Sequence, residues 1–256
     1  MTETGRYLYA IARGLDPQAM TGVPALGGGH LDVVEHLGLA AVVSSVDLDE
    51  YGEEGLRRNL ENLSWLEEVA RGHDTVVQAV AEQSPTAPLR LATICHDDDG
   101  VRARLEEWHD ALEEVLDRIE GRREWSVKVF ARPRPAPAAA ESTAGGASAG
   151  GAAYLQRKKA ESQAREADES SAAAIADEVH HSLAGRSVAG RRLPPQDPRL
   201  TGRTDRMLHN GAYLVPAEEG DAFAAVVEEL RAAHPDVTIE SAGPWPPYSF
   251  ATLEQS

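Results

Sequence analysis

The first part of the chain has the hydrophobic pattern of strands. Residues 7–12 are apolar at both odd and even positions, as in a strand that is covered on both faces. Two more apolar segments, residues 31–37 and 40–46, follow at short intervals, and the second is rich in β-branched residues. Because glycine-containing turns join these three short segments, we expect an antiparallel sheet.

A helical pattern follows these strands. Apolar residues recur every three or four positions, which predicts one long helix over about residues 53–83, interrupted by Gly72. A strand over residues 89–94 and a helix over residues 101–119 come next, the helix having apolar residues spaced alternately by four and three. These elements predict an α+β domain over residues 1–124. The apolar face of the long helix begins with Leu56, Leu60, Leu63, Leu66 and Val69.

The composition changes abruptly after a predicted strand at residues 125–130. Residues 131–153 are almost entirely alanine, glycine, proline and serine, with too few large apolar side chains to offset the entropy cost of ordering, so we expect a disordered loop. Residues 154–184 predict an alanine-rich helix that is lightly buried at the surface. Residues 185–204 are typical of a loop with one edge strand.

The last third of the chain predicts a strand over residues 207–215, a helix over 218–234 and a strand over 237–241. The order strand, long helix, edge strand, strand, helix, strand is ferredoxin-like. We therefore expect an α+β protein of two domains. The first has an antiparallel sheet and helices, and residues 125–256 form a C-terminal modified ferredoxin-like domain, with the disordered loop 131–153 after its first strand.

The formal charge of −17 is unevenly distributed over the 256 residues. Residues 1–125 carry 25 acidic residues against 11 lysines and arginines, a balance of −14, and the rest of the chain has a balance of −3. An acidic surface repels phosphate backbones, so the charge argues against nonspecific nucleic-acid binding by the first half. No apolar run approaches the about 20 residues of a membrane span, and residues 1–20 lack the pattern of a signal peptide. We expect a soluble protein that is made in the cytosol.

Few residues suggest catalysis or metal binding. Cys95 is the only cysteine, which excludes an intramolecular disulfide and a cysteine-based zinc site. The segment from Cys95 onward matches part of a calcium loop, but a thiol stands at the first ligand position and Ala103 at the ninth. We expect its aspartates, Asp97, Asp98 and Asp99, to cap the following helix.

The remaining motifs lack the context that they need. The adjacent His180 and His181 would point about 100° apart on a helix, and no HExxH motif is present. The GxSxG match around Ser148 lies in the low-complexity segment rather than at a strand-to-helix turn. Residues 27–29 lack the spacing of a phosphate-binding loop. We therefore predict no catalytic residues, no metal ligands and no cofactor.

The most unusual segment is Gly243-Pro244-Trp245-Pro246-Pro247-Tyr248-Ser249-Phe250. Its three prolines fix φ and remove backbone donors, so the segment must leave the sheet stiff and extended. Trp245, Tyr248 and Phe250 either fold back as a clamp over the protein's own core or form an aromatic ledge for a partner. The clamp and the ledge are compatible with each other.

This octapeptide, at the end of a chain with this order of elements, resembles the gas vesicle protein F/L family. Other segments agree with the resemblance, which covers nearly the whole chain: Tyr7–Ile11, Ala40–Ser44, the helix around His73 with Pro88–Arg90 and Thr93, Trp125–Val129, Tyr154–Leu155 and Ala212–Val215. One departure is Leu91-Ala92-Thr93, where the family typically has Phe-Gly-Thr, and it concerns the local backbone turn.

The resemblance implies a non-enzymatic accessory protein of gas vesicles, located at the vesicle within the cytoplasm. Such proteins bind the small hydrophobic shell protein, help to start or extend the wall and can associate with other accessory proteins; the resemblance implies no membrane or nucleic-acid partner. We expect Trp245, Tyr248 and Phe250, or the alanine-rich helix, to be the contact surface.

Two other classes of function stay open. A small-ligand-binding protein or an enzyme could use the ferredoxin-like sheet as a pocket, and a ligand would then stabilise the protein in a saturable way. A ferredoxin-like sheet can also bind RNA through stacked aromatic residues, although the acidic charge argues against this.

Overall fold

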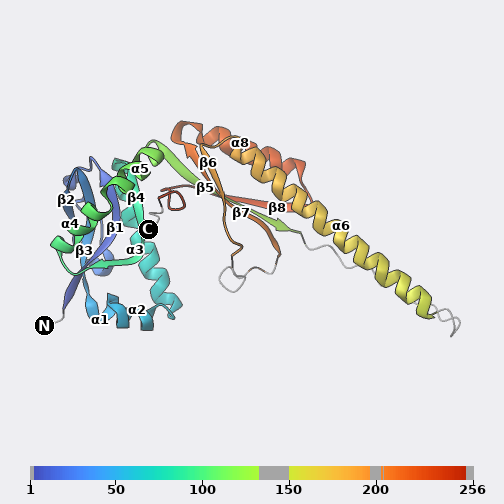
Figure 1. Cartoon of the computed structure of the whole chain (residues 1–256), viewed down its shortest axis with the longest axis horizontal. Helices are drawn as coiled ribbons and strands as arrows, with labels where there is room; N and C mark the ends of the chain where they lie inside the picture. The colour runs from blue at the N-terminus through green and yellow to red at the C-terminus, as the bar shows by residue number, and fades with distance from the viewer. Residues whose placement is uncertain (1–2, 133–149, 197–202, 204, 252–256) are drawn as a thin grey trace. The chain divides into compact units, whose positions relative to one another are not determined.

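The computed structural model of this chain describes most of it, in four stretches: residues 3–132, 150–196, 203 and 205–251. The chain divides into two compact units, which are taken separately below. The first consists of Met1–Glu124 together with Gly243–Ser256, and the second is Trp125–Ala242. Both units combine helices with a four-stranded sheet (Figure 1), so the predicted α+β fold class is confirmed.

The sheet of the first unit is antiparallel, as predicted. Its strands follow one another in the order β2-β3-β1-β4, and each neighbouring pair is antiparallel. Two short 3-10 helices, η1 (Pro17–Met20) and η2 (Leu26–Gly28), lie between β1 and β2 along the chain. The strand bounds are β1 (Thr4–Arg13), β2 (Leu31–His36), β3 (Leu39–Asp47) and β4 (Thr86–Cys95).

Strand β1 is the centre of this core. All its residues from Tyr7 to Ala12 have an exposed fraction of 0%, which confirms the prediction of a strand covered on both faces. The register with both neighbours shifts between Leu8 and Ala10, so Tyr9 and Ala10 belong to the same buried cluster although they are adjacent in sequence.

The predicted long helix is divided, but not at Gly72. Helix α2 (Glu53–Asn59) ends before Leu60, and α3 (Leu63–Gln83) begins after Asn62, whose side chain accepts the N–H groups of Ser64 and Trp65. This cap starts a new helix. Gly72 lies inside α3, where a Cβ would be 2.6 Å from Leu26 Cδ2, so it permits close packing instead of breaking the helix.

The helix predicted over residues 101–119 is also two helices. Helix α4 (Asp98–Glu107) and helix α5 (His109–Ile119) are separated by Trp108, whose φ of −100° and ψ of 3° are not helical. The break leaves the apolar stripe in place, because Leu105 and Leu112 on either side of it are both completely buried. A short helix, α1 (Leu48–Tyr51), completes the first unit's helices among the described residues.

The second unit has the predicted ferredoxin-like topology. Its elements follow in the order strand, helix, strand, strand, helix, strand, with the sheet order β6-β7-β5-β8. The short strand β6 lies at one edge, as expected, and a 3-10 helix, η3 (Ala217–Glu219), precedes α8. The bounds are β5 (Arg122–Ala131), α6 (Gly150–Ala184), β6 (Ala189–Arg192), β7 (Met207–Pro216), α8 (Gly220–Ala233) and β8 (Val237–Trp245).

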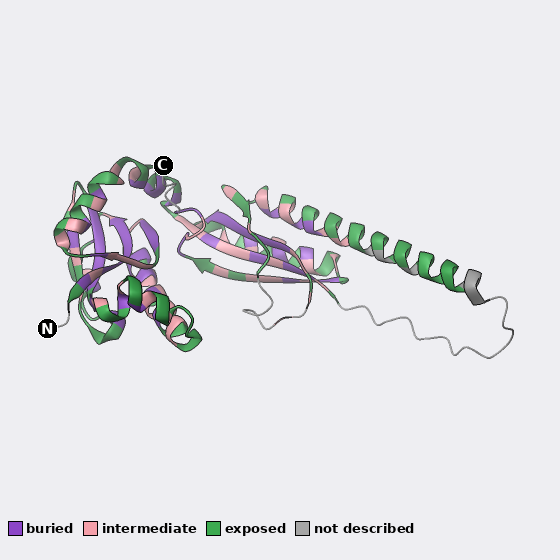
Figure 2. Cartoon of the chain, turned by 60° about the horizontal axis from the view of Figure 1, so that its bottom comes forward, coloured by how far each residue is buried: buried purple, intermediate pink, exposed green. Residues whose placement is uncertain are grey.

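Among the α6 side chains that the structure describes, those of the last turns contribute to this second core, and Val179 and Leu183 have exposed fractions of 0%. Tyr154 and Leu155 near the start of the helix are 53% and 66% exposed. Figure 2 shows that most of the described length of α6 is exposed. The prediction of a disordered loop over residues 131–153 is wrong at both ends, because β5 includes Ala131 and α6 begins at Gly150. Residues 133–149 lie outside the described residues.

Ala92, which stands where the family's Phe-Gly-Thr pattern has glycine, has a left-handed backbone conformation. Ala92 has a φ of 61°, and its N–H donates a hydrogen bond to Tyr7 Oη at 3.2 Å. A Cβ in this region costs about 1–2 kcal/mol, while glycine makes the unfolded chain more flexible. We expect Ala92→Gly to raise the free energy of unfolding by about 0.5–1 kcal/mol in urea denaturation, the net of these two effects.

The control for this prediction is Ala103→Gly at an exposed position of α4. There the glycine only weakens a helix, and we expect a loss of about 1 kcal/mol. A loss of stability in Ala92→Gly comparable to that in Ala103→Gly would show that the left-handed conformation carries no cost.

Candidate functional site

The proline-rich segment Gly243–Phe250 packs against the first unit. The segment was predicted to belong to the C-terminal domain, but by its contacts it groups with residues 1–124. Pro246 and Pro247 are buried, and their carbonyl groups accept the N–H groups of Tyr248 and Phe250, so the chain turns immediately after β8.

Polar side chains of the first unit hold this segment in place. Glu124, with an exposed fraction of 8%, accepts hydrogen bonds from the N–H and the hydroxyl of Ser249 at 2.7 and 2.6 Å. Arg118 donates to the carbonyl of Phe250 at 2.9 Å. Tyr248 Oη donates to Asp74 Oδ1 at 3.2 Å, and burial together with the nearby Asp74 carboxylate raises the pKa of Tyr248.

The three aromatic residues of the segment differ in their exposure. Phe250 is buried with an exposed fraction of 3%, and Tyr248 is half-buried against the core cluster of the first unit. Trp245 is 41% exposed. The clamp therefore accounts for Tyr248 and Phe250, and of the three only Trp245 offers substantial surface to a partner.

A buried histidine lies beneath the clamp. His73 in α3 is 2% exposed, and its Nδ1 lies 3.0 Å from Tyr7 Oη. The ring packs near those of Tyr7, Tyr9 and Tyr248. Burial lowers the pKa of His73 to about 4, so the imidazole is neutral at physiological pH.

The second unit contains a comparable cluster that the sequence analysis did not find. The hydroxyl of Tyr213 lies 3.0 Å from His180 Nδ1 and 2.9 Å from His209 Nε2. Burial, with a contribution from His180, lowers the pKa of His209 to about 4. Gly211 lies between the two β7 residues, and a Cβ there would collide with both polar groups. The ring of His181 packs edge-on against that of His180, with centroids 5.9 Å apart, and its Nδ1 contacts the Asp177 carbonyl instead of Tyr213.

The acidic loop after β4 caps a helix, as predicted. Asp97 Oδ1 accepts the N–H of Gly100 at 2.8 Å, and Asp98 and Asp99 lie in the first turn of α4. Cys95 is buried, and burial raises the pKa of its thiol. Within the four described stretches, no group of three or more His, Cys, Asp or Glu side chains could hold a metal ion.

Two exposed leucines at the α2–α3 corner were expected on the apolar face of one long helix. Leu60 and Leu63 are instead 50% and 68% exposed, and they lie on either side of the helix break. Asn62 was the sequence signal that could have revealed this break, because asparagine is a preferred N-cap residue.

The sheet of the second unit carries one small hollow of about 270 Å³. Its arginine, Arg231, already donates to the carbonyl of Ile239 and to the hydroxyl of Ser241, and it is ion-paired with Glu228. Lys128 and Glu240 also line the hollow, so charges of both signs face it. In the part of the chain that the structure describes, no helix has the length and apolar character that crossing a membrane requires.

Comparison with known proteins shows similarity to gas vesicle proteins over almost the whole chain. The family model described as "Gas vesicle synthesis protein GvpL/GvpF" matches residues 5–252. Gas vesicle protein L of Streptomyces sp. (strain CB03234) is 38% identical over 255 residues, covering 99% of this chain and 95% of that protein. Gas vesicle protein F2 of Halobacterium salinarum (strain ATCC 700922 / JCM 11081 / NRC-1) is 26% identical, covering 99% and 94%.

Solved structures share the fold. The crystal structure of the gas vesicle protein GvpF from Anabaena sp. PCC7120 matches with a TM-score of 0.67 and 20% identity over 98% of both chains. That of GvpF from Microcystis aeruginosa has a TM-score of 0.68 and 20% identity, over 97% of this chain and 99% of that one. Because the family model spans almost all of the sequence, this chain belongs to the GvpL/GvpF family of gas vesicle synthesis proteins.

Proposed function

We propose that this protein acts in gas vesicle formation as a non-enzymatic escort for the small hydrophobic shell protein. It binds shell subunits in the cytoplasm and delivers them to the growing wall, where it assists nucleation or growth. Membership in the GvpL/GvpF family supports the gas vesicle role. Other accessory proteins of the vesicle are further partners in this proposal.

The observation that carries the proposal is the exposure of large apolar side chains on a strongly acidic unit. Leu60, Leu63 and Trp245 of the first unit have exposed fractions of 50%, 68% and 41%. An apolar client can bury such side chains on binding, and each buried leucine contributes about 1.5–3 kcal/mol before the costs of association. The net charge of −17 would keep the complex dispersed.

Co-expression with the shell protein tests this proposal. We expect the full-length protein to keep the shell protein soluble and to retain it in a pull-down. The double variant Leu60→Ser/Leu63→Ser and the single variant Trp245→Ser should each reduce the retained shell protein several-fold, because they remove exposed apolar surface. A third variant, Tyr154→Ser/Leu155→Ser, tests α6 as the contact surface.

The matched control is Val188→Ser in the second unit, where a 51% exposed apolar side chain is also removed. Thermal unfolding of every variant should stay within a few degrees of wild type, since none of these side chains is buried. If the shell protein is insoluble with or without this protein, and none is retained, the escort role is wrong.

A further inference from the structure

The turn between β2 and β3 presents an unusual leucine. Leu37 and Gly38 connect the two strands with φ values of 50° and 82°, as a type I′ turn requires. Glycine and asparagine are the residues that favour this first position, because a branched side chain is strained at positive φ. The side chain of Leu37 is nevertheless 55% exposed, so it gains little from packing within the protein.

A groove of about 490 Å³ lies at the base of this turn. One wall comes from Gly14 and Leu15 at the end of β1, and the other comes from residues 35–40 of the hairpin. Leu15 and Leu39 line the groove but are almost completely buried, so Leu37 supplies its exposed apolar surface. The groove thus combines polar lining residues, Glu35 and His36, with one exposed apolar side chain, Leu37.

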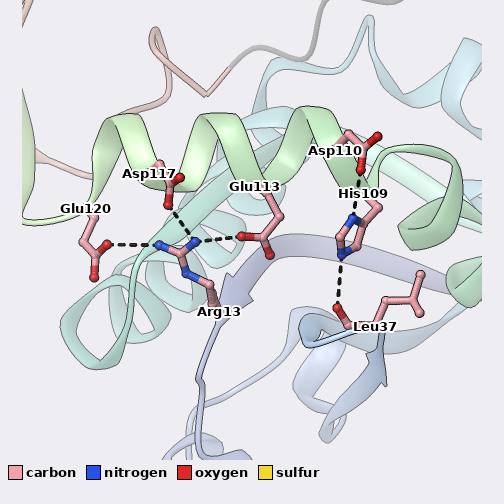
Figure 3. Close-up of polar contacts among 7 residues, drawn as sticks. All are labelled: Arg13, Leu37, His109, Asp110, Glu113, Asp117 and Glu120. Atoms are coloured by element: carbon pink, nitrogen blue, oxygen red, sulfur yellow. Dashed lines mark hydrogen bonds and ion pairs between the residues drawn. The ribbon is translucent and has the colours of Figure 1, made fainter.

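Helix α5 is fixed next to the turn. The Nε2 of His109 lies 3.2 Å from the Leu37 carbonyl, and its Nδ1 lies 3.2 Å from Asp110 Oδ1 (Figure 3). The Asp110 carboxylate raises the pKa of His109 and thereby favours the imidazolium, which donates to both oxygens. The acidic face of α5 therefore adjoins the turn.

One arginine, Arg13, forms ion pairs with three carboxylates of that face. Arg13 Nη1 lies 2.7 Å from Glu113 and 2.8 Å from Asp117, and its Nη2 lies 3.0 Å from Glu120 (Figure 3). Glu35 lines the groove itself, and Glu106 faces His36 at 3.8 Å. Negative charge therefore exceeds positive charge around the groove, with these carboxylates: Glu35, Glu106, Asp110, Glu113, Asp117 and Glu120.

We propose that the groove and Leu37 form a docking surface for a cationic amphipathic segment of a partner protein. An apolar side chain of the segment packs against Leu37 at the groove, and lysine or arginine side chains on either side meet the surrounding carboxylates. Charge complementarity selects this occupant over an acidic or a purely apolar one. This surface is separate from the apolar residues assigned to the shell protein, and the inference does not depend on the proposed function.

Fluorescence anisotropy with two synthetic peptides tests the proposal on the full-length protein. Both peptides have 18 residues with the same amphipathic order of leucine and polar positions, but the polar residues are lysine in one and glutamate in the other. We expect the leucine-lysine peptide to bind, with an affinity that falls as salt rises, and the leucine-glutamate peptide not to bind. Leu37→Asn should weaken binding of the leucine-lysine peptide at least ten-fold.

Leu37→Asn also separates binding from folding, because asparagine tolerates positive φ and the variant should unfold at the same temperature as wild type or a higher one. Leu155→Asn, which removes a 66% exposed leucine elsewhere, is the control and should bind like wild type. Glu35→Gln/Glu106→Gln/Asp110→Asn should weaken binding and flatten its salt dependence. Equal binding by wild type and Leu37→Asn, or by the two peptides, would overturn the proposal.

Discussion

Phe250→Ala is expected to destabilise the first unit by about 3 kcal/mol, the typical cost of truncating a buried phenylalanine. The Phe250 side chain is 3% exposed. Hydrogen bonds fix the backbone on both sides of its Cα, since Arg118 donates to the Phe250 carbonyl and Glu124 accepts the N–H of Ser249. The truncation therefore leaves a cavity beneath a segment that cannot move far. Amide hydrogen exchange measures the effect separately in each unit, and we expect the faster exchange in β1 and α3 rather than in β7.

Trp245→Ala is the control for this prediction. It removes an aromatic side chain from the same segment, but Trp245 is 41% exposed, so the loss should stay below about 1 kcal/mol. Equal exchange rates in the two variants would mean that the segment does not clamp the core. The comparison also bears on partner binding, because a loss of binding in Phe250→Ala would follow from unfolding, whereas a loss in Trp245→Ala would not.

Acidification from pH 7.5 to pH 5 is expected to destabilise both units, each by about 2 kcal/mol. His73 in the first unit and His209 in the second have pKa values lowered to about 4 by burial, against about 6.5 in an unfolded chain. Between these two values the unfolded state binds the proton and the folded state does not. The stability is therefore fully present above about pH 6.5 and is lost progressively as the pH falls toward 4.

Urea unfolding at the two pH values, followed by pulse proteolysis with fragments assigned to each unit, measures this effect. His73→Gln removes one titrating group and should flatten the pH dependence of the first unit, whatever its own cost at pH 7.5. The second unit of the same variant serves as the internal control, because His209 is unchanged. An unaltered pH dependence of the first unit in His73→Gln would show that another group is responsible.

The contacts of the two buried histidines, His73 and His209, could not be predicted from the local sequence pattern. His180 and His209 belong to a helix and a strand that are separated along the chain by the edge strand β6, and only the fold brings both to the hydroxyl of Tyr213. His73 follows the apolar stripe of α3 by helical spacing, yet nothing in its immediate sequence indicates that Tyr7 lies opposite.

Hydrophobic period and capping residues were sufficient for the strands, the ferredoxin-like order and the capping aspartates after Cys95, because each depends on neighbours in sequence. The family followed from the resemblance of the proline-rich octapeptide to a known motif. The tertiary structure alone decided two other features. It exposed Leu37 at a strained turn, and it packed Tyr248 and Phe250 onto the first unit. Each of these depends on which distant surface is available to cover a side chain, and such packing has no counterpart in local sequence.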